Sequence, residues 1–173
     1  MSAGDAGVKS KGAEGKSAAG FHCIGPSDRR PRAARVPGSQ VDVICDASTP
    51  TASLIAGVNT LAPGARIPLH FDDHEELQYI LSGDGLALDA DGREHRLEPG
   101  SAVHCAAGRS AAHGFVNNGQ APLAILYVYA TPRAVPPSLE WLEDLPAGSE
   151  NMPVAGTWPA PVPHVSGREG TGG

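Results

Sequence analysis

Cysteine is scarce in this chain of 173 residues, which has only Cys23, Cys45 and Cys105 and no CxxC pair. Three scattered cysteines are too few for a disulfide framework. The longest apolar stretch, Ala121 to Ala130, is too short to span a bilayer, and the N-terminus lacks the apolar run of a signal peptide. We therefore expect a soluble cytoplasmic protein without a membrane partner.

Positive charge is scarce outside the first forty residues. The net charge is −6, but residues 1–40 hold seven of the 13 Lys and Arg and three of the 19 Asp and Glu. That segment carries +4, so the remainder carries −10. Binding to nucleic acid needs a basic face for the phosphates, so we expect no nucleic-acid partner.

Glycine (22) and proline (16) are abundant and gather toward the ends of the chain. Residues 1–38 are small, polar and without periodicity, so we expect a disordered or extended segment. Residues 39–133 are expected to form one folded domain. Residues 134–173 are expected to form a short helix over 136–145, with a proline in its first turn, and then a flexible Pro/Gly-rich tail.

Alternation of apolar and polar residues in the central part is typical of β-strands. Turn signals recur every 8–12 residues, which indicates an all-β antiparallel sandwich or barrel. Asp91-Gly92 is expected to form the tight turn of a hairpin over 85–97. The other expected strands cover residues 39–46, 52–61, 67–71, 76–82, 101–106, 112–117 and 122–130.

The stretch PLHFDDHEELQYILSG, residues 68–83, concentrates side chains that bind metals. It places His70, Asp72, His74 and Glu76 at every second position, and alternate residues of a strand share a face. A short turn would fold two strands together here and bring these side chains toward one point. His113, on a later strand, is the natural further ligand.

These residues resemble the two motifs of the cupin family. The first motif is G-x5-H-x-H-x3,4-E-x6-G, and its positions are occupied by Gly64, His70, Asp72, Glu76 and Gly83. The second motif is G-x5-P-x-G-x2-H-x3-N, and its positions are occupied by Gly100, Ala106, Gly108, His113 and Asn117. The resemblance covers about residues 50 to 130. It implies a double-stranded β-helix, or jelly-roll barrel, with a mononuclear metal and, as in many small cupins, a homodimer.

Three departures from the motifs bear on the metal. Asp72 stands in place of a histidine, Ala106 in place of the proline, and four residues rather than two separate Gly108 from His113. If Asp72 is a ligand beside His70, Glu76 and His113, two carboxylates favour Mn or Fe(II). If His74 swings in from the turn instead, three His and one Glu suit Fe, Ni, Cu or Zn.

The second arrangement is preferred, because a histidine has little other reason to lie beside three acids. Both arrangements stay open at this point. The resemblance favours Fe(II) among the divalent transition metals.

Three further polar residues are candidate catalytic groups. Gln78 and Arg66 share strand faces with the expected ligands, and buried polar groups need partners. A substrate carboxylate or a neighbouring acid would serve Arg66 equally well. His104 precedes the Gly108 loop as a candidate proton-transfer group or as an ordinary wall residue. Tyr79 and Tyr127 are expected on the outer sheet face, at the dimer interface.

The resemblance implies three functions for the site. The first is a metal-dependent enzyme with oxygenase-like chemistry on a small-molecule substrate. The second is a lyase, isomerase or cyclase with a redox-inert metal and a protein base. The third is a binding module without catalysis, since the substitutions in the motifs are compatible with a degenerate site. The fold hosts many activities, so it does not decide among them.

Overall fold

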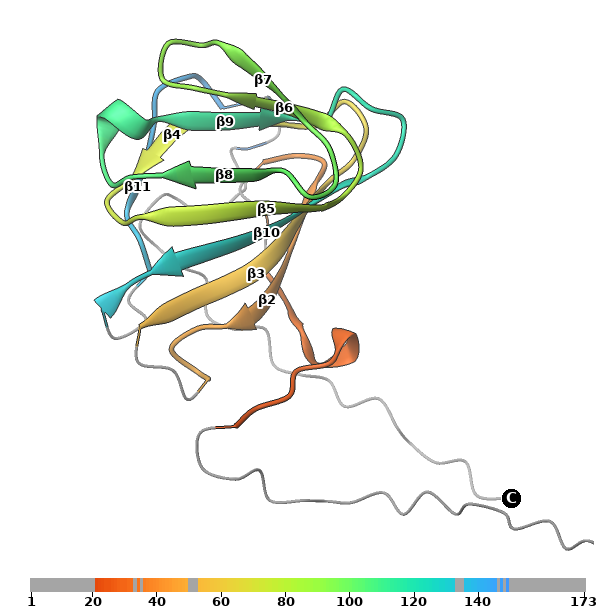
Figure 1. Ribbon diagram of the computed structural model, residues 1–173, viewed down its shortest axis with the longest axis vertical. Helices are drawn as coiled ribbons and strands as arrows, with labels where there is room; N and C mark the ends of the chain where they lie inside the picture. Colours follow the sequence, from red (N-terminus) through yellow and green to blue (C-terminus); the bar gives the residue numbers. More distant parts are fainter. Residues whose placement is uncertain are drawn as a thin grey trace, which may run out of the picture.

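The computed structural model describes residues 21–32, 34, 36–49, 53–132, 136–145, 147 and 149 (Figure 1). The predicted disorder of residues 1–20 and the predicted tail from residue 150 onward lie outside the described residues. The elements in chain order are η1 Pro26–Asp28, β1 Arg30–Arg32, β2 Ser39–Cys45, β3 Leu54–Leu61, β4 Arg66–Asp72, β5 Glu76–Ser82, β6 Gly85–Leu88, β7 Glu94–Leu97, β8 Ala102–Cys105, η2 Arg109–Ala111, β9 His113–Val116, β10 Leu123–Ala130 and β11 Leu139–Trp141.

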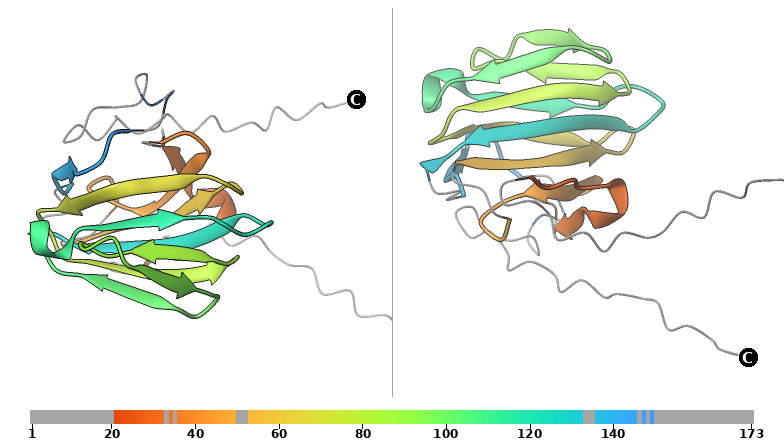
Figure 2. Two further views of the ribbon diagram at one scale, coloured as in Figure 1. Left: turned by 90° about the horizontal axis from the view of Figure 1, so that it is seen from above. Right: turned by 60° about the horizontal axis from the view of Figure 1, so that its bottom comes forward.

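Two antiparallel sheets make up the domain (Figures 1 and 2). One has the strand order β1-β2-β3-β10-β5-β8, and the other has the order β11-β4-β9-β6-β7. Strands that are neighbours in one sheet are often distant in sequence, as β3 and β10 are. The all-β architecture expected from the sequence is therefore confirmed as a double-stranded β-helix.

The apolar core lies between the two sheets. Phe115 of β9 is 1% exposed and packs in one cluster with Ile80 of β5 and Ile125 of β10, which come from the opposite sheet. The other buried members of this cluster are Leu61, Ala87, Leu97 and Leu123. Burial of these side chains is the main force that holds the sheets together.

Alternation on β5 separates an inner from an outer face. Glu76, Gln78 and Ile80 are buried, whereas Leu77 and Tyr79 are 46% and 43% exposed. Tyr79 thus lies on the outer face as predicted. The prediction for Tyr127 is wrong, because the inner residues of β10 are Leu123, Ile125, Tyr127 and Tyr129. The homodimer itself stays a prediction.

The prediction of a helix over residues 136–145 is wrong. These residues are described, and within them Leu139–Trp141 forms strand β11. β11 pairs antiparallel with β4, so that Leu139 lies opposite Asp72 and Trp141 opposite His70. The Leu142 amide donates to the Leu69 carbonyl at 2.8 Å. A short helix has marginal stability by itself, and hydrogen bonds to an open sheet edge outweigh its local preference.

Part of the segment expected to be disordered is ordered. β1 pairs with β2, and the Arg30 guanidinium forms an ion pair with Asp46 at 2.7 Å. Hydrogen bonds from Arg30 and Ser48 outweigh partial burial and lower the pKa of Asp46 below its usual range. Arg30 therefore attaches this part of the segment to the sheet.

Within the described part of the chain, no helix has the length and apolar character needed to cross a membrane.

Candidate metal centre

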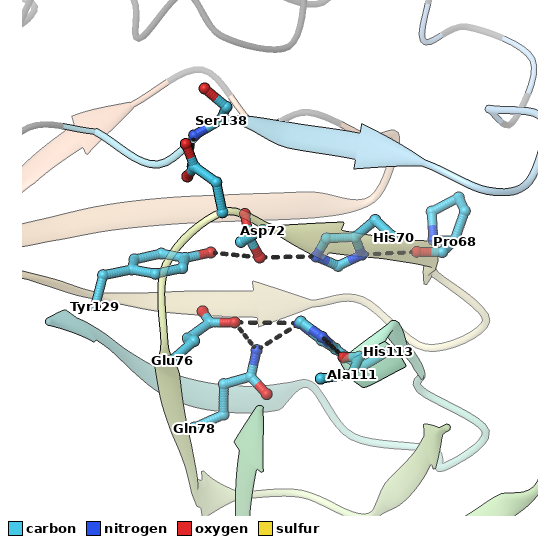
Figure 3. A network of polar contacts seen from close by, with 10 residues as sticks. Pro68, His70, Asp72, Glu76, Gln78, Ala111, His113, Tyr129 and Ser138 are labelled. Carbon is cyan, nitrogen blue, oxygen red and sulfur yellow. Dashed lines mark hydrogen bonds and ion pairs between the residues drawn. The ribbon is translucent and has the colours of Figure 1, made fainter. Parts of the chain in front are cut away.

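The candidate centre lies between the sheets where β4, β5 and β9 bring their polar residues together (Figure 3). Alternation along β4 buries Pro68, His70 and Asp72. His70 lies opposite His113 of β9 in the ladder, and their ring centroids are 4.4 Å apart. Opposed residues of an antiparallel pair share a face, so both imidazoles point into the space between the sheets.

Three ligand atoms are grouped closely enough to bind one ion. One ligand atom each from His70, Asp72 and His113 lies within 4.8 Å of the others. These residues are 4%, 3% and 4% exposed, respectively. Glu76, 3% exposed, lies outside this group of three, but its Oε2 is 3.1 Å from His113 Nε2.

Both imidazoles are oriented by backbone carbonyls. His70 Nδ1 lies 2.9 Å from the Pro68 carbonyl oxygen, and His113 Nδ1 lies 3.1 Å from that of Ala111. A carbonyl only accepts, so each Nδ1 carries the hydrogen and donates it. This leaves Nε2 directed at the centre, which is how metal-binding histidines are commonly held.

The loop before His113 is fixed to the end of β4. The Gly108 amide donates to the Asp72 carbonyl at 2.7 Å, and Gly108 has φ +94°, a conformation that favours glycine. The longer loop of the second motif is accommodated by η2. Asn117 joins two segments of the chain, because its side-chain amide donates to the carbonyls of Leu61 and Ala121.

A second set of contacts involves Gln78, which is 4% exposed. Its amide nitrogen donates to Glu76 Oε2 at 2.5 Å and lies 3.2 Å from His113 Nε2. Its Oε1 has no hydrogen-bond partner among the described residues. A buried acceptor without a donor is costly, so this oxygen is suited to accept from a bound ligand.

The electrostatics of the centre favour a positive charge. Burial disfavours a charged imidazole, but hydrogen bonds with Cys105 and Glu76 outweigh it and raise the pKa of His113 to about 11. A metal ion that binds Nε2 therefore displaces a proton.

The donor set fits a divalent cation. Asp72 and Glu76 are two buried carboxylates, and His70 and His113 supply two imidazole nitrogens. Carboxylate oxygens and imidazole nitrogens are ligands that divalent transition metals accept. A divalent ion bound there would replace the proton of His113 as the positive charge beside Glu76.

His74, the preferred alternative to Asp72, does not join the centre. It lies in the turn between β4 and β5, where its Nδ1 is 2.6 Å from Asp73 Oδ1. Hydrogen bonds from His74 and the Ser138 amide outweigh partial burial and lower the pKa of Asp73 below its usual range. The choice of His74 is corrected, because the turn directs its ring to this neighbouring carboxylate.

Two of the three candidate catalytic groups also lie away from the centre. The Arg66 guanidinium forms an ion pair with Glu143 at the surface, with 43% of its side chain exposed, so it does not point inward. Arg66 is the first residue of β4, where the chain is still open to solvent. His104 is 58% exposed and its Nε2 lies 2.6 Å from Glu75 Oε1. Only Gln78 lies among the candidate ligands.

Two aromatic residues at the centre were missed. The Tyr129 hydroxyl donates to Asp72 Oδ2 at 3.4 Å, and the Trp141 ring centroid lies 5.0 Å from that of His70. Tyr129 lies in an apolar run, so the sequence does not indicate which face of the strand it occupies. Trp141 lies in a segment that was expected to be a helix, so its place opposite His70 was not predicted. The sequence holds no local signal for either contact.

Comparison with known proteins is consistent with this arrangement. Residues 57–129 match the family model described as a cupin domain. This part of the chain is a cupin domain. No curated protein matches the sequence.

Among solved structures, the polyketide cyclase RemF from Streptomyces resistomycificus has 22% identity and a TM-score of 0.61, over 73% of this chain and 89% of that chain. A sugar phosphate isomerase of the cupin superfamily from Silicibacter pomeroyi has 22% identity and a TM-score of 0.61, over 71% and 83%. An uncharacterized conserved protein with a double-stranded β-helix domain from Klebsiella pneumoniae has 21% identity and a TM-score of 0.51, over 70% and 91%. Such similarity shows the cupin fold alone.

Proposed function

We propose that this cupin is a metal-dependent enzyme that oxidises a small-molecule substrate at one divalent ion, with Fe(II) as the favoured metal. The observation that carries the proposal is the buried group of His70, Asp72 and His113. Two histidines and one carboxylate with open positions are the ligand set of non-haem Fe(II) oxygenases. Fe(II) bound there would supply oxygen chemistry; Mn, Ni, Cu and Zn are the alternatives.

The residues of the chain prepare this site in three ways. The Pro68 and Ala111 carbonyls hold the two imidazoles with Nε2 directed at the centre. Tyr129 donates to the Asp72 carboxylate and limits its rotation. Burial of all three donors excludes bulk water and strengthens each polar contact.

Glu76 and Gln78 complete the proposed site. Glu76 is the fourth candidate ligand, beside His113. The Gln78 amide nitrogen is held by Glu76, so its oxygen is left to accept from a substrate hydroxyl or amine. Of the three residues predicted to be catalytic, Gln78 is therefore the one to which we assign a direct contact with the substrate.

The second candidate is lyase, isomerase or cyclase chemistry with a redox-inert metal. The Tyr129 phenol favours it, because a buried hydroxyl 3.4 Å from Asp72 Oδ2 is placed to give or take a proton at the centre. Structures with the same fold include a cyclase and an isomerase, which makes this chemistry compatible with the scaffold.

The deciding experiment loads the full chain anaerobically with Fe(II) or, separately, with Zn(II). Each form is incubated with a panel of hydroxy, oxo and carboxylic acids, with and without dioxygen. Dioxygen uptake with product formation that requires Fe(II) and is lost in His113→Ala supports the oxygenase. Equal turnover with Zn(II) and no dioxygen uptake supports the second candidate. Binding without turnover in either form supports a ligand-binding cupin.

A further inference from the structure

Aromatic side chains are few in this protein but gather at the metal centre. The chain has three Phe, three Tyr and two Trp. Phe115 meets His113 edge-on at 6.0 Å between ring centroids, and Trp141 lies 5.0 Å from His70 at an interplanar angle of 52°. Tyr129 contacts Asp72 and lies 5.9 Å from the Tyr127 ring. Each proposed ligand of the group of three thus has an aromatic neighbour.

Trp141 differs from the other aromatic neighbours in its exposure. Phe115, Tyr127 and Tyr129 are buried in the space between the sheets, whereas Trp141 is only half-buried. It lies directly opposite His70 in the β11–β4 pairing, so its side chain is on the same face as the ligand. The indole therefore lies beside this candidate ligand and keeps part of its surface exposed.

The segment that carries Trp141 is fixed at both ends. Before β11, the Asp73 and Ser138 backbones are joined by a hydrogen bond of 3.1 Å, and the Ser138 amide also donates to Asp73 Oδ1 at 2.8 Å. After β11, the Glu143 carboxylate accepts from the Leu69 amide at 3.2 Å and pairs with Arg66. The backbone that carries the indole is thus held in place before any ligand arrives, which limits the entropy lost on binding.

From this geometry we infer that Trp141 is a specificity-determining residue that stacks on a planar aromatic ring of the substrate. The substrate class is a small molecule in which such a ring bears the oxygen group that binds the metal. An indole face gives a ring a contact beyond simple area burial, with offset or tilted geometry. The inference rests on the proposed metal-dependent function.

The test compares two metal-binding probes that differ in one ring. Acetohydroxamate and benzohydroxamate share the same chelating group, so the ratio of their dissociation constants reports the contact with the phenyl ring. The full chain is loaded with Co(II), and binding is followed by the visible absorption of the ion. Aromatic contacts of this kind correspond to an effect of about 2- to 10-fold in that ratio.

The variants are Trp141→Ala, Trp141→Leu and Trp141→Phe, with Tyr79→Ala on the outer sheet face as the matched aromatic control. We expect the preference for benzohydroxamate to fall in the Ala and Leu variants, to be largely kept in Trp141→Phe and to be unchanged in Tyr79→Ala. Affinity for acetohydroxamate should stay the same throughout, since the ligands are intact.

An unchanged ratio in the folded, Co(II)-loaded Trp141→Leu protein would overturn the inference and leave the proposed function standing. Wild-type protein that takes up no Co(II) would overturn the proposed function, and this inference with it. The two failures are therefore distinguishable.

Discussion

Replacing Asp72 by Asn separates the two possible ligand sets. Asp72 is 3% exposed within the group of three donors, whereas His74 pairs with Asp73 in the turn. Asn keeps the shape of Asp and can still accept from Tyr129, but it loses the charge that a metal ion requires. Loss of a residue that only orients a ligand already weakens metal affinity by about 10- to 100-fold. Asp72 is a proposed ligand itself, so Asp72→Asn should weaken metal affinity by at least about 100-fold.

The stability change follows from this loss of affinity. At a metal concentration 100 times the wild-type Kd, binding adds about 2.7 kcal/mol to the free energy of unfolding, and a 100-fold weaker variant gains only about 0.4 kcal/mol. For a domain of this size, each kcal/mol of added stability raises Tm by about 4–8 °C. Metal should therefore raise Tm by about 10–20 °C in the wild type and by about 2–3 °C in Asp72→Asn.

The assay is calorimetric unfolding of each protein with and without Co(II), at a concentration set by titration of the wild type. His74→Ala is the matched control, and it should keep the full rise in Tm. Without metal, Asp72→Asn should be no less stable than the wild type, because a buried charge has been removed. A full rise in Asp72→Asn together with a lost rise in His74→Ala would refute the assignment of Asp72.

Three other substitutions test separate parts of the account. Gly57→Ala should destabilise the fold by about 1–3 kcal/mol in urea denaturation, because its Cβ would collide with the Tyr127 hydroxyl; an unchanged midpoint would contradict the packing. Gln78→Met should weaken Co(II) affinity by about 10- to 100-fold in titration calorimetry, since its amide orients two candidate ligands; unchanged affinity would contradict this positioning role. Arg66→Ala should cost under about 1 kcal/mol and leave Co(II) affinity unchanged, because its pair with Glu143 is exposed; a large loss of affinity would restore an inward role for Arg66.

Alternation within single strands was enough to predict much of the centre. His70 and Asp72 are two residues apart on β4, and Glu76 and Gln78 are two apart on β5, so each pair shares an inner face. The motif spacing added His113 from a strand far along the chain. These features are local periodicities or fixed spacings, which a sequence displays directly.

The features that sequence reasoning missed depend on partners elsewhere in the fold. β11 forms because the edge of β4 is open to it, and residues 136–145 alone give no sign of that edge. In the apolar run Leu123–Ala130 both faces look alike, so the inward direction of Tyr127 and Tyr129 is not visible. His74 was misplaced because the turn geometry, not the spacing, directs its ring.

The central claim is that this cupin domain holds one metal ion, and elemental analysis tests it most directly. The full chain is purified without an affinity tag and without added metal, alongside His113→Ala. We predict about one equivalent of a divalent transition metal per chain in the wild type and little in the variant, with the β-fold retained by circular dichroism. Wild-type protein that is free of metal and also refuses added Fe(II), Mn(II) and Zn(II) would contradict the claim.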